Sequence, residues 1–459
     1  MLNNIKSKNI FQKIFRNIKK VIKLKILKHN KNYLNKLNMD LKDYQEFKSI
    51  RKFNKKYKLS LKNSDETRLW LDWKLIGDEG LDFLSQLEFT ELIELKLVNN
   101  KISDIKVLER MKFEKLEDLD LHWNNISDIN IFEKLNFKNL KRLNLSDNNI
   151  INFDVLKKIN ILNLEILDLS KNKQININSL ANINFTKLKE LQLEECNLTD
   201  INVLGKIQFN KLEILDLSRN KIKDINILEN ENFKSLKKLK LNSNDITNIE
   251  VLQKAKFQSI EEITLSYNKI KDINILEKTD FKELKVIYLY SNEISDIKVF
   301  EKVNFPKLYS LALEGNKISD IKVLENVILK NLQNLNLGRN QISDINILEK
   351  VKFEKLKRLN FDENNISNIE VLDKVNFPEL ETLKFCDNKI TDIKVLENVK
   401  FKKLKELDLR ENKISEINVF ENVKLESLES LDLCNNNIDK TKYSNLISQM
   451  KSKIRFLRI

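Results

Sequence analysis

The chain of 459 residues contains only five glycines and two prolines, well below the ordinary usage of about 7% and about 5%. So few turn residues fit a long array of one short unit better than a mixture of loops and packed layers. The three cysteines are too few and too scattered for a disulfide framework or a zinc site. The sequence has two histidines and no glycine-rich phosphate loop, Cys–His pair or serine elbow. We therefore expect no enzymatic activity, no metal and no cofactor.

The net charge of +14 is concentrated at the N-terminus. Residues 1–62 carry 19 Lys and Arg against 3 Asp and Glu, whereas the remainder carries 63 against 65. No apolar run approaches the length of about 20 residues that a membrane span needs. Lys and Asn also interrupt the N-terminal apolar residues, so no signal-peptide core forms. These features lead us to expect a reduced, cytoplasmic protein.

Residues 1–62 are expected to form a basic helical segment. Apolar residues from Ile10 to Ile22 recur at helical spacing, which predicts an amphipathic helix. The basic residues of this helix are Lys13, Arg16, Lys19, Lys20 and Lys23. The helix could lie on an anionic membrane surface, enter a groove of a partner, act as a targeting peptide or pack against the body of the protein. Charge alone is weak support for nucleic-acid binding, which we do not expect.

Residues 63–91 read as a degenerate repeat that caps the N-terminal end. Leu71, Trp73 and Leu81 fall at or near the apolar positions of the units that follow, but Ile76 stands where those units have an asparagine. Residues 92–438 contain fifteen units of 24 residues, marked by an asparagine at every unit except the one with Cys196. Residues 439–459 are expected to form a C-terminal cap, because a stacked array must cover its last apolar edge.

Each unit follows the pattern Leu-x-x-Leu-x-Leu-x-x-Asn-x-Ile, as in the unit that begins at Leu116. The alternating Leu-x-Leu predicts a half-buried strand, and the asparagine amide can satisfy backbone groups at the bend after it. An aspartate or asparagine then precedes a short helix or 3-10 segment as a cap. One unit cannot bury its leucines alone, so the units must stack.

This pattern resembles the leucine-rich repeat and looks most like its short subclass, which includes a regulatory subunit of protein phosphatase 1 and the bacterial internalins. The resemblance covers about residues 90–438. It implies an α/β solenoid shaped as a curved horseshoe, with a parallel concave sheet and short helices or 3-10 turns on the convex side. It also implies that partners bind the concave sheet. Regulation of a phosphatase follows only from this resemblance.

Residues between and just after the leucines of the strand are expected to face the concave side. Three groups stand out there as candidate contact residues: Asp118, Asp120, His122 and Trp123; Glu190 and Glu194; Tyr267, Tyr288 and Tyr290. Clustered tyrosines with little charge around them are typical of interface hot spots. The sequence therefore predicts a non-enzymatic scaffold that binds a protein of unknown identity. The alternative is a peripheral membrane protein anchored by its basic helix.

Overall fold

A computed structural model describes residues 41–61, 66–87, 89–111 and 113–459, which belong to two compact units, Met1–Leu188 and Lys189–Ile459. The predicted amphipathic helix, with Lys13, Arg16, Lys19, Lys20 and Lys23, lies outside the described residues. None of the helices in the described ranges is long and apolar enough to cross a membrane.

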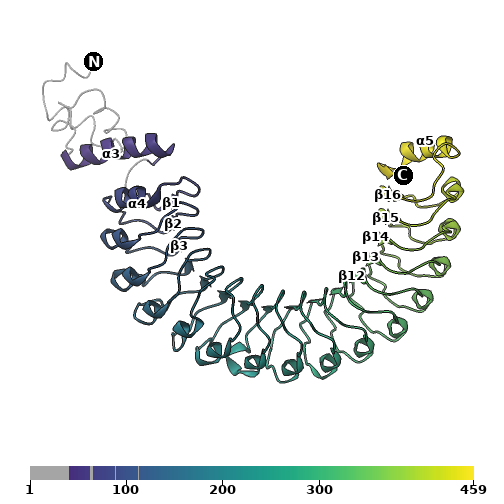
Figure 1. Cartoon of the computed structure of the whole chain (residues 1–459), viewed down its shortest axis with the longest axis horizontal. Coiled ribbons are helices and arrows are strands. Elements are labelled where there is room, and N and C mark those ends of the chain that lie inside the picture. The colour runs from purple at the N-terminus through teal and green to yellow at the C-terminus, as the bar shows by residue number, and fades with distance from the viewer. Residues whose placement is uncertain (1–40, 62–65, 88, 112) are drawn as a thin grey trace, which may run out of the picture. The chain divides into compact units, whose positions relative to one another are not determined.

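The strands of each unit form a parallel sheet in which every strand lies beside its neighbour in sequence (Figure 1). From β2 to β5 and from β6 to β16, paired residues are 24 positions apart, so each repeat adds one strand. Unit 1 contains β1 Arg68–Trp70, β2 Glu94–Lys96, β3 Asp118–Asp120, β4 Arg142–Asn144 and β5 Ile166–Asp168. Unit 2 contains β6 Glu190–Gln192, β7 Ile214–Asp216, β8 Lys238–Lys240, β9 Glu262–Thr264, β10 Val286–Tyr288, β11 Ser310–Ala312, β12 Asn334–Asn336, β13 Arg358–Asn360, β14 Thr382–Lys384, β15 Glu406–Asp408, β16 Ser430–Asp432 and β17 Phe456–Arg458.

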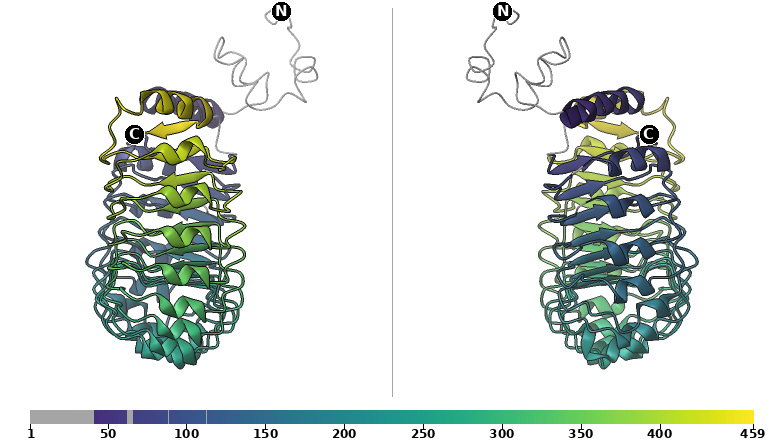
Figure 2. Two further views of the ribbon diagram at one scale, coloured as in Figure 1. Left: turned by 90° about the vertical axis from the view of Figure 1, so that its right-hand side faces the viewer. Right: turned by 90° about the vertical axis from the view of Figure 1, so that its left-hand side faces the viewer.

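The return segment of each repeat is a 3-10 helix and not an α-helix. In unit 1 these helices are η3 Lys106–Arg110, η4 Asn130–Lys134, η5 Asp154–Lys157 and η6 Ile177–Leu180. In unit 2 they are η7 Asn202–Lys206, η8 Asn226–Glu229, η9 Glu231–Phe233, η10 Glu250–Gln253, η11 Asn274–Lys278, η12 Lys298–Glu301, η13 Lys322–Glu325, η14 Asn346–Glu349, η15 Glu370–Asp373, η16 Lys394–Glu397 and η17 Asn418–Glu421. Figure 2 shows these segments stacked in a column within each unit.

The two edges of each repeat define two faces of the unit. In each unit the strands follow the inner side of the curve along which the repeats stack, and the 3-10 helices follow the outer side (Figure 1). In most repeats an aspartate or asparagine before the 3-10 helix caps its first turn, as when the Asp128 carboxylate accepts the Asn130 N–H at 2.8 Å and the Asn152 side-chain oxygen accepts the Asp154 N–H at 2.7 Å. The outward side chains of each strand form one surface together with the two residues that follow the first buried residue after the strand. We call this surface the strand face.

Leucines and phenylalanines fill the space between the two faces. Leu119 and Leu121 of one repeat are fully buried, and each such side chain contributes about 2 kcal/mol by leaving water. A phenylalanine closes most repeats and packs on that of the next, with ring centroids 6.3 Å apart between Phe281 and Phe305. Because one repeat supplies only half of each contact, burial depends on stacking.

The repeated asparagine connects each repeat to its neighbour. The Asn148 amide donates to the carbonyl of Leu145 in its own repeat at 3.1 Å and to that of Leu121 in the preceding repeat at 3.0 Å. Its side-chain oxygen accepts the N–H of Ile126, also in the preceding repeat, at 3.0 Å. The structure thus confirms the role predicted for this amide. At Cys196 the thiol offers only one weak donor, which reaches the Glu194 carbonyl at 3.5 Å.

The residue immediately before this asparagine has a left-handed backbone in all fifteen units, with φ from 50° to 67°. Gly315 is the only glycine at this position, so the other units place ordinary side chains there at a cost of about 1 kcal/mol each. The asparagine bonds on either side keep this conformation in place. The sequence gives no sign of it, because no glycine repeats with the unit.

Additional elements cover both ends of the stack. In unit 1, α3 Leu41–Tyr57 buries Ile50 and Phe53, and the Phe53 ring stacks at 4.5 Å on Phe83 of α4 Gly77–Ser85. In unit 2, α5 Ser444–Lys453 buries Leu446 and Met450, and β17 pairs with β16. The apolar edge of the first repeat in unit 1 and that of the last repeat in unit 2 are therefore covered.

One register in unit 1 differs from the spacing of the sequence repeat. β1 pairs with β2 at an offset of 26 residues, as shown by Trp70 opposite Lys96. Trp73 therefore does not take the buried position that a 24-residue spacing gives it, and its side chain is 59% exposed. The prediction that Trp73 sits at an apolar position of the repeat is wrong, because the first unit is two residues longer than the others.

Replacing one asparagine of the ladder tests how much the inter-repeat bonds stabilise the fold. Asn244 is 7% exposed, donates to the carbonyls of Leu217 and Leu241 and accepts the N–H of Ile222. Asn244→Ala leaves these buried groups without partners and should lower the free energy of unfolding by about 2–4 kcal/mol. Urea unfolding measures the change. The exposed Asn304→Ala is the control, and an equal effect of both substitutions would contradict this account.

Candidate functional site

The three tyrosines singled out in the sequence form one cluster on the strand face of unit 2. Tyr288 belongs to β10, Tyr290 follows that strand and Tyr267 follows β9. The rings of Tyr267 and Tyr290 meet edge to face with centroids 5.1 Å apart, and those of Tyr288 and Tyr290 lie 6.3 Å apart. Tyr267 is 55% exposed. We call these three residues the tyrosine patch.

The surroundings of the tyrosine patch carry little charge. Thr264 and Ser266 precede Tyr267 and are buried, and Ala312 lies opposite Tyr288 on β11. The charged side chains on the neighbouring positions of the sheet are paired: Glu262 with Lys238 at 3.2 Å, and Glu314 with Arg339 at 3.6 Å. The Ser266 hydroxyl is buried and has no hydrogen-bond partner. The patch thus presents aromatic rings and phenol groups with no adjacent unpaired charge.

The residues Asp118, Asp120, His122 and Trp123 lie on or just after β3 in unit 1. The carboxylate of Asp120 accepts the backbone N–H of His122 at 3.0 Å. The His122 Nδ1 lies 2.7 Å from the Ser146 hydroxyl, which itself donates to Asn144 at 2.6 Å. Because that hydroxyl has only one proton, Nδ1 is the donor to it.

The structure adds Trp73 to this cluster. The rings of Trp73 and Trp123 meet edge to face with centroids 4.8 Å apart, although the two residues follow strands that are two positions apart in the sheet. Sequence reasoning missed Trp73 because it placed this residue among the apolar positions. The signal was the repeated pairing of a polar residue with a tryptophan, Asp72-Trp73 and His122-Trp123, directly after a strand.

The acidic group predicted at Glu190 and Glu194 in unit 2 is less negative than its sequence indicates. Arg219 from the next repeat lies 3.1 Å from the Glu194 carboxylate. The Gln192 amide donates to the carboxylate of Glu190. Arg219 occupies the left-handed position of its repeat, which the sequence does not reveal. The structure therefore partly neutralises this surface.

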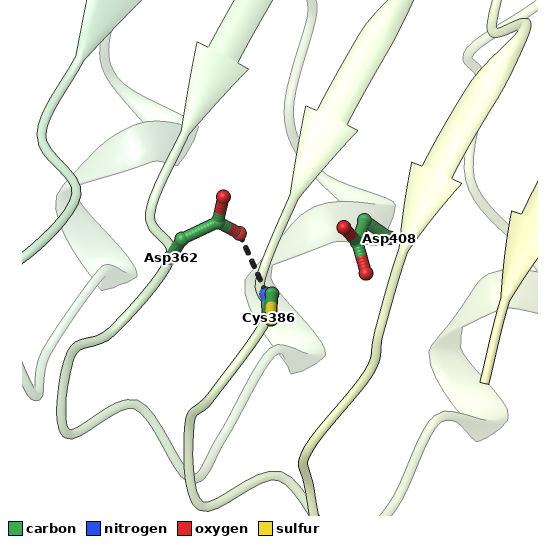
Figure 3. Close-up of side chains that lie close together, drawn as sticks. All are labelled: Asp362, Cys386 and Asp408. Atoms are coloured by element: carbon green, nitrogen blue, oxygen red, sulfur yellow. Dashed lines mark hydrogen bonds between the residues drawn. The ribbon is translucent and has the colours of Figure 1, made fainter. Parts of the chain in front are cut away.

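A further group that the sequence did not single out is Asp362, Cys386 and Asp408, on consecutive repeats of unit 2 (Figure 3). One oxygen or sulfur atom of each lies within 4.8 Å of the others. The Cys386 N–H donates to Asp362 at 2.7 Å, and the Arg410 guanidinium donates to Asp408 at 2.9 and 2.7 Å. The positions are 24 and 22 residues apart, which is the only sequence signal.

The electrostatics of this group do not favour a metal ion. Burial raises the pKa of the Cys386 thiol to about 12, so the thiol stays protonated at neutral pH. Burial also raises the pKa of Asp362 to about 6. Since Arg410 already neutralises Asp408, the group has little free negative charge to offer a cation. We interpret it as a hydrogen-bonded part of the strand face.

Comparisons with known proteins agree with the repeat architecture. Three family models match: "Leucine Rich repeats (2 copies)" over residues 378–422, "Leucine Rich repeat" over 210–225 and "Leucine Rich Repeat" over 427–450. A comparison with curated protein sequences finds no match.

Several solved structures are similar. A leucine-rich repeat protein of Leptospira interrogans is 20% identical, with a TM-score of 0.58 over 89% of this chain and 97% of its own. The ectodomain of the Arabidopsis receptor kinase HAESA, solved with a peptide hormone, is 23% identical, with a TM-score of 0.51 over 82% of this chain and 62% of its own. An internalin (inlF) from Listeria monocytogenes is 26% identical, with a TM-score of 0.48 over 85% of this chain and 97% of its own.

The raised pKa of Asp362 predicts a pH-dependent loss of stability. The pKa is 3.8 in the reference state and about 6 in the folded chain, so the folded chain retains a proton that the unfolded chain releases between these values. The contribution of Asp362 to stability should therefore fall as the pH rises from about 4 to about 6. Asp362→Asn keeps the acceptor for the Cys386 N–H and removes the carboxylate.

At a pH of about 7, Asp362→Asn should be more stable than the natural chain by about 1 kcal/mol, a value reduced for partial solvent exposure. The gain should be mostly lost at a pH of about 4, where Asp362 is neutral in the folded natural chain and only partly ionised in the unfolded chain. Urea unfolding at both pH values measures the difference. A variant that is equally stable or less stable than the natural chain at neutral pH would rule out a penalty from this carboxylate.

Proposed function

The chain is a leucine-rich repeat protein, and we propose that it acts as a non-enzymatic scaffold that binds a protein partner on its strand face, with the tyrosine patch as the principal contact. The observation that carries this proposal is the edge-to-face contact, with ring centroids 5.1 Å apart, between the exposed Tyr267 and the half-buried Tyr290. A tyrosine exposed on a regular sheet has no role in the core of its own unit.

The geometry of the patch supports binding in two ways. The rings are held by one another and by strands that are paired on both sides, so little side-chain freedom is lost when a partner binds. Tyrosine also combines a large apolar ring with a hydroxyl, which suits it to the centre of an interface. Small residues, Ser291 and Gly315, take the position of Tyr267 in the next two repeats, so no large side chain stands beside the Tyr267 ring in that row.

The charge distribution supports the same conclusion. Elsewhere on the repeats, cations and anions of neighbouring units pair with each other, as Lys285 does with Glu261 at 2.8 Å. Exposed pairs of this kind contribute little to stability or affinity. The tyrosine patch lies between such pairs and has none of its own, which leaves an apolar surface for a partner of matching shape.

Removing the tyrosine patch should abolish partner binding without unfolding the chain. Tyr267→Ala with Tyr290→Ala removes two rings of the kind that contribute about 2 kcal/mol or more each at interface centres, so affinity should fall by roughly a thousandfold if the two contributions add. The measurement is quantitative proximity labelling in native cells, with circular dichroism to confirm equal folding.

The matched control is Tyr309→Ala, which removes a tyrosine that is 38% exposed in the same unit but lies outside the patch. A protein whose labelling drops only in the double variant supports the proposal. If the set of labelled proteins is unchanged in the double variant, or changes equally in the Tyr309 variant, the tyrosine patch is not the binding site.

A further inference from the structure

The three tryptophans of the chain lie close together on the strand face of unit 1, and all are exposed. The exposed fractions are 57% for Trp70, 59% for Trp73 and 46% for Trp123. Tryptophan is the largest apolar side chain, and its burial would stabilise the fold by more than that of a leucine. Exposure of every tryptophan at one end of one unit therefore points to a ligand.

Trp73 and Trp123 are held in fixed positions. Both have a left-handed backbone, and their N–H groups continue the sheet hydrogen bonds, from Trp73 to the Val98 carbonyl at 2.8 Å and from Trp123 to that of Ser146 at 3.0 Å. The two rings meet at 82°, so a face of one and an edge of the other form a corner. A rigid corner of two indoles loses little freedom when it binds a ligand.

Two carboxylates belong to the same segments as these rings, Asp72 directly before Trp73 and Asp120 three residues before Trp123. Asp72 accepts the Val98 N–H at 3.0 Å, and Asp120 is only 8% exposed. Across the described part of the chain, neither has a cationic side chain within ion-pair distance. Burial raises the pKa of Asp120, and repulsion by the Asp72 carboxylate raises it further. A cation placed here would offset both effects.

A third carboxylate, Asp118, lies two residues before Asp120 on β3. One of its oxygens is buried without a hydrogen bond and forms only a long ion pair with Arg142, at 3.8 Å. A carboxylate whose charge is so weakly compensated adds to the negative potential of this part of the strand face, which favours a cationic ligand.

The adjoining tryptophan shows how a cation binds to such a surface. The Lys96 ammonium lies 5.6 Å from the centre of the Trp70 ring and 2.8 Å from the carboxylate of Glu94. One cation thus contacts an indole and a carboxylate together. Within the described residues, no cation of the chain takes the corresponding place over Trp73 or Trp123.

We propose that Asp72, Trp73, Asp120 and Trp123, here called the acid–tryptophan surface, bind an arginine side chain presented by a partner protein. A guanidinium group stacks flat on indole and bonds a carboxylate through two N–H groups, whereas an ammonium group is smaller and more strongly hydrated. The carboxylates make the surface unsuitable for a nucleic-acid phosphate. This surface lies in unit 1 and is independent of the tyrosine patch.

The tryptophans themselves provide the measurement. In the full chain carrying Trp70→Phe, the fluorescence excited at the red edge of indole absorption comes only from Trp73 and Trp123. The probe is a short acetylated peptide of alternating glycine and arginine, compared with the same peptide containing lysine or the neutral analogue citrulline. The arginine peptide should change the emission with a dissociation constant below about 1 mM. Lysine should bind more weakly, and citrulline should have no effect.

Asp72→Asn with Asp120→Asn, added to the same chain, should weaken binding of the arginine peptide about tenfold. The substitution at Asp120 keeps the bond to the His122 N–H, because Asn144 makes the equivalent bond to Ser146 in the next repeat at 3.0 Å. The matched control is Asp168→Asn, which alters a carboxylate with the same backbone bond, to Ser170, two strands away.

Two results would overturn the proposal. One is tryptophan emission that stays unchanged up to about 1 mM arginine peptide. This result would contradict the proposal whether the surface is inert or is already covered by another part of the chain. The other is an equal response of the double aspartate variant and the Asp168 control, which would place the peptide elsewhere. A response that the double variant loses and the control keeps supports arginine binding at this surface.

Discussion

In every repeat of this chain except the one with Cys196, one side-chain amide connects the bend after the strand to the preceding repeat. This asparagine donates to a carbonyl of its own repeat and to one of the preceding repeat, and accepts an N–H from the preceding repeat, as Asn244 does with Leu241, Leu217 and Ile222. All of these groups would otherwise be buried without partners at the bend. The amide therefore sets the distance between neighbouring bends, and it requires each unit to present the same backbone.

Two consequences follow from that requirement. The leucines of successive repeats are placed in line, so the core is continuous within each unit. The residue before the asparagine is also held in a left-handed conformation in every unit, whatever its side chain. Trp123 and Tyr267 both occupy this position, so the bond network that holds the repeats together also positions one exposed aromatic residue in each of the two candidate surfaces.

The repeat could be predicted from the sequence because it depends on local, periodic chemistry. The 24-residue spacing, the inward leucines and the role of the asparagine all follow from residue identity and are confirmed. The left-handed position could not be predicted, because no glycine marks it. The exposure of Trp73 was missed because it depends on a register shift of two residues. The pairing of Glu194 with Arg219 depends on side chains from neighbouring repeats, which a single unit does not show.

The central claim is that a protein partner contacts the tyrosine patch. Site-specific photo-crosslinking tests this claim most directly. A photoreactive phenylalanine at Ser291 would sit in the left-handed position next to that of Tyr267, where an aromatic side chain is already accommodated. One at the exposed Lys298, on η12, would report on the opposite face. We expect a cross-linked partner from Ser291 and none from Lys298. A partner captured only from Lys298 would contradict binding at the strand face.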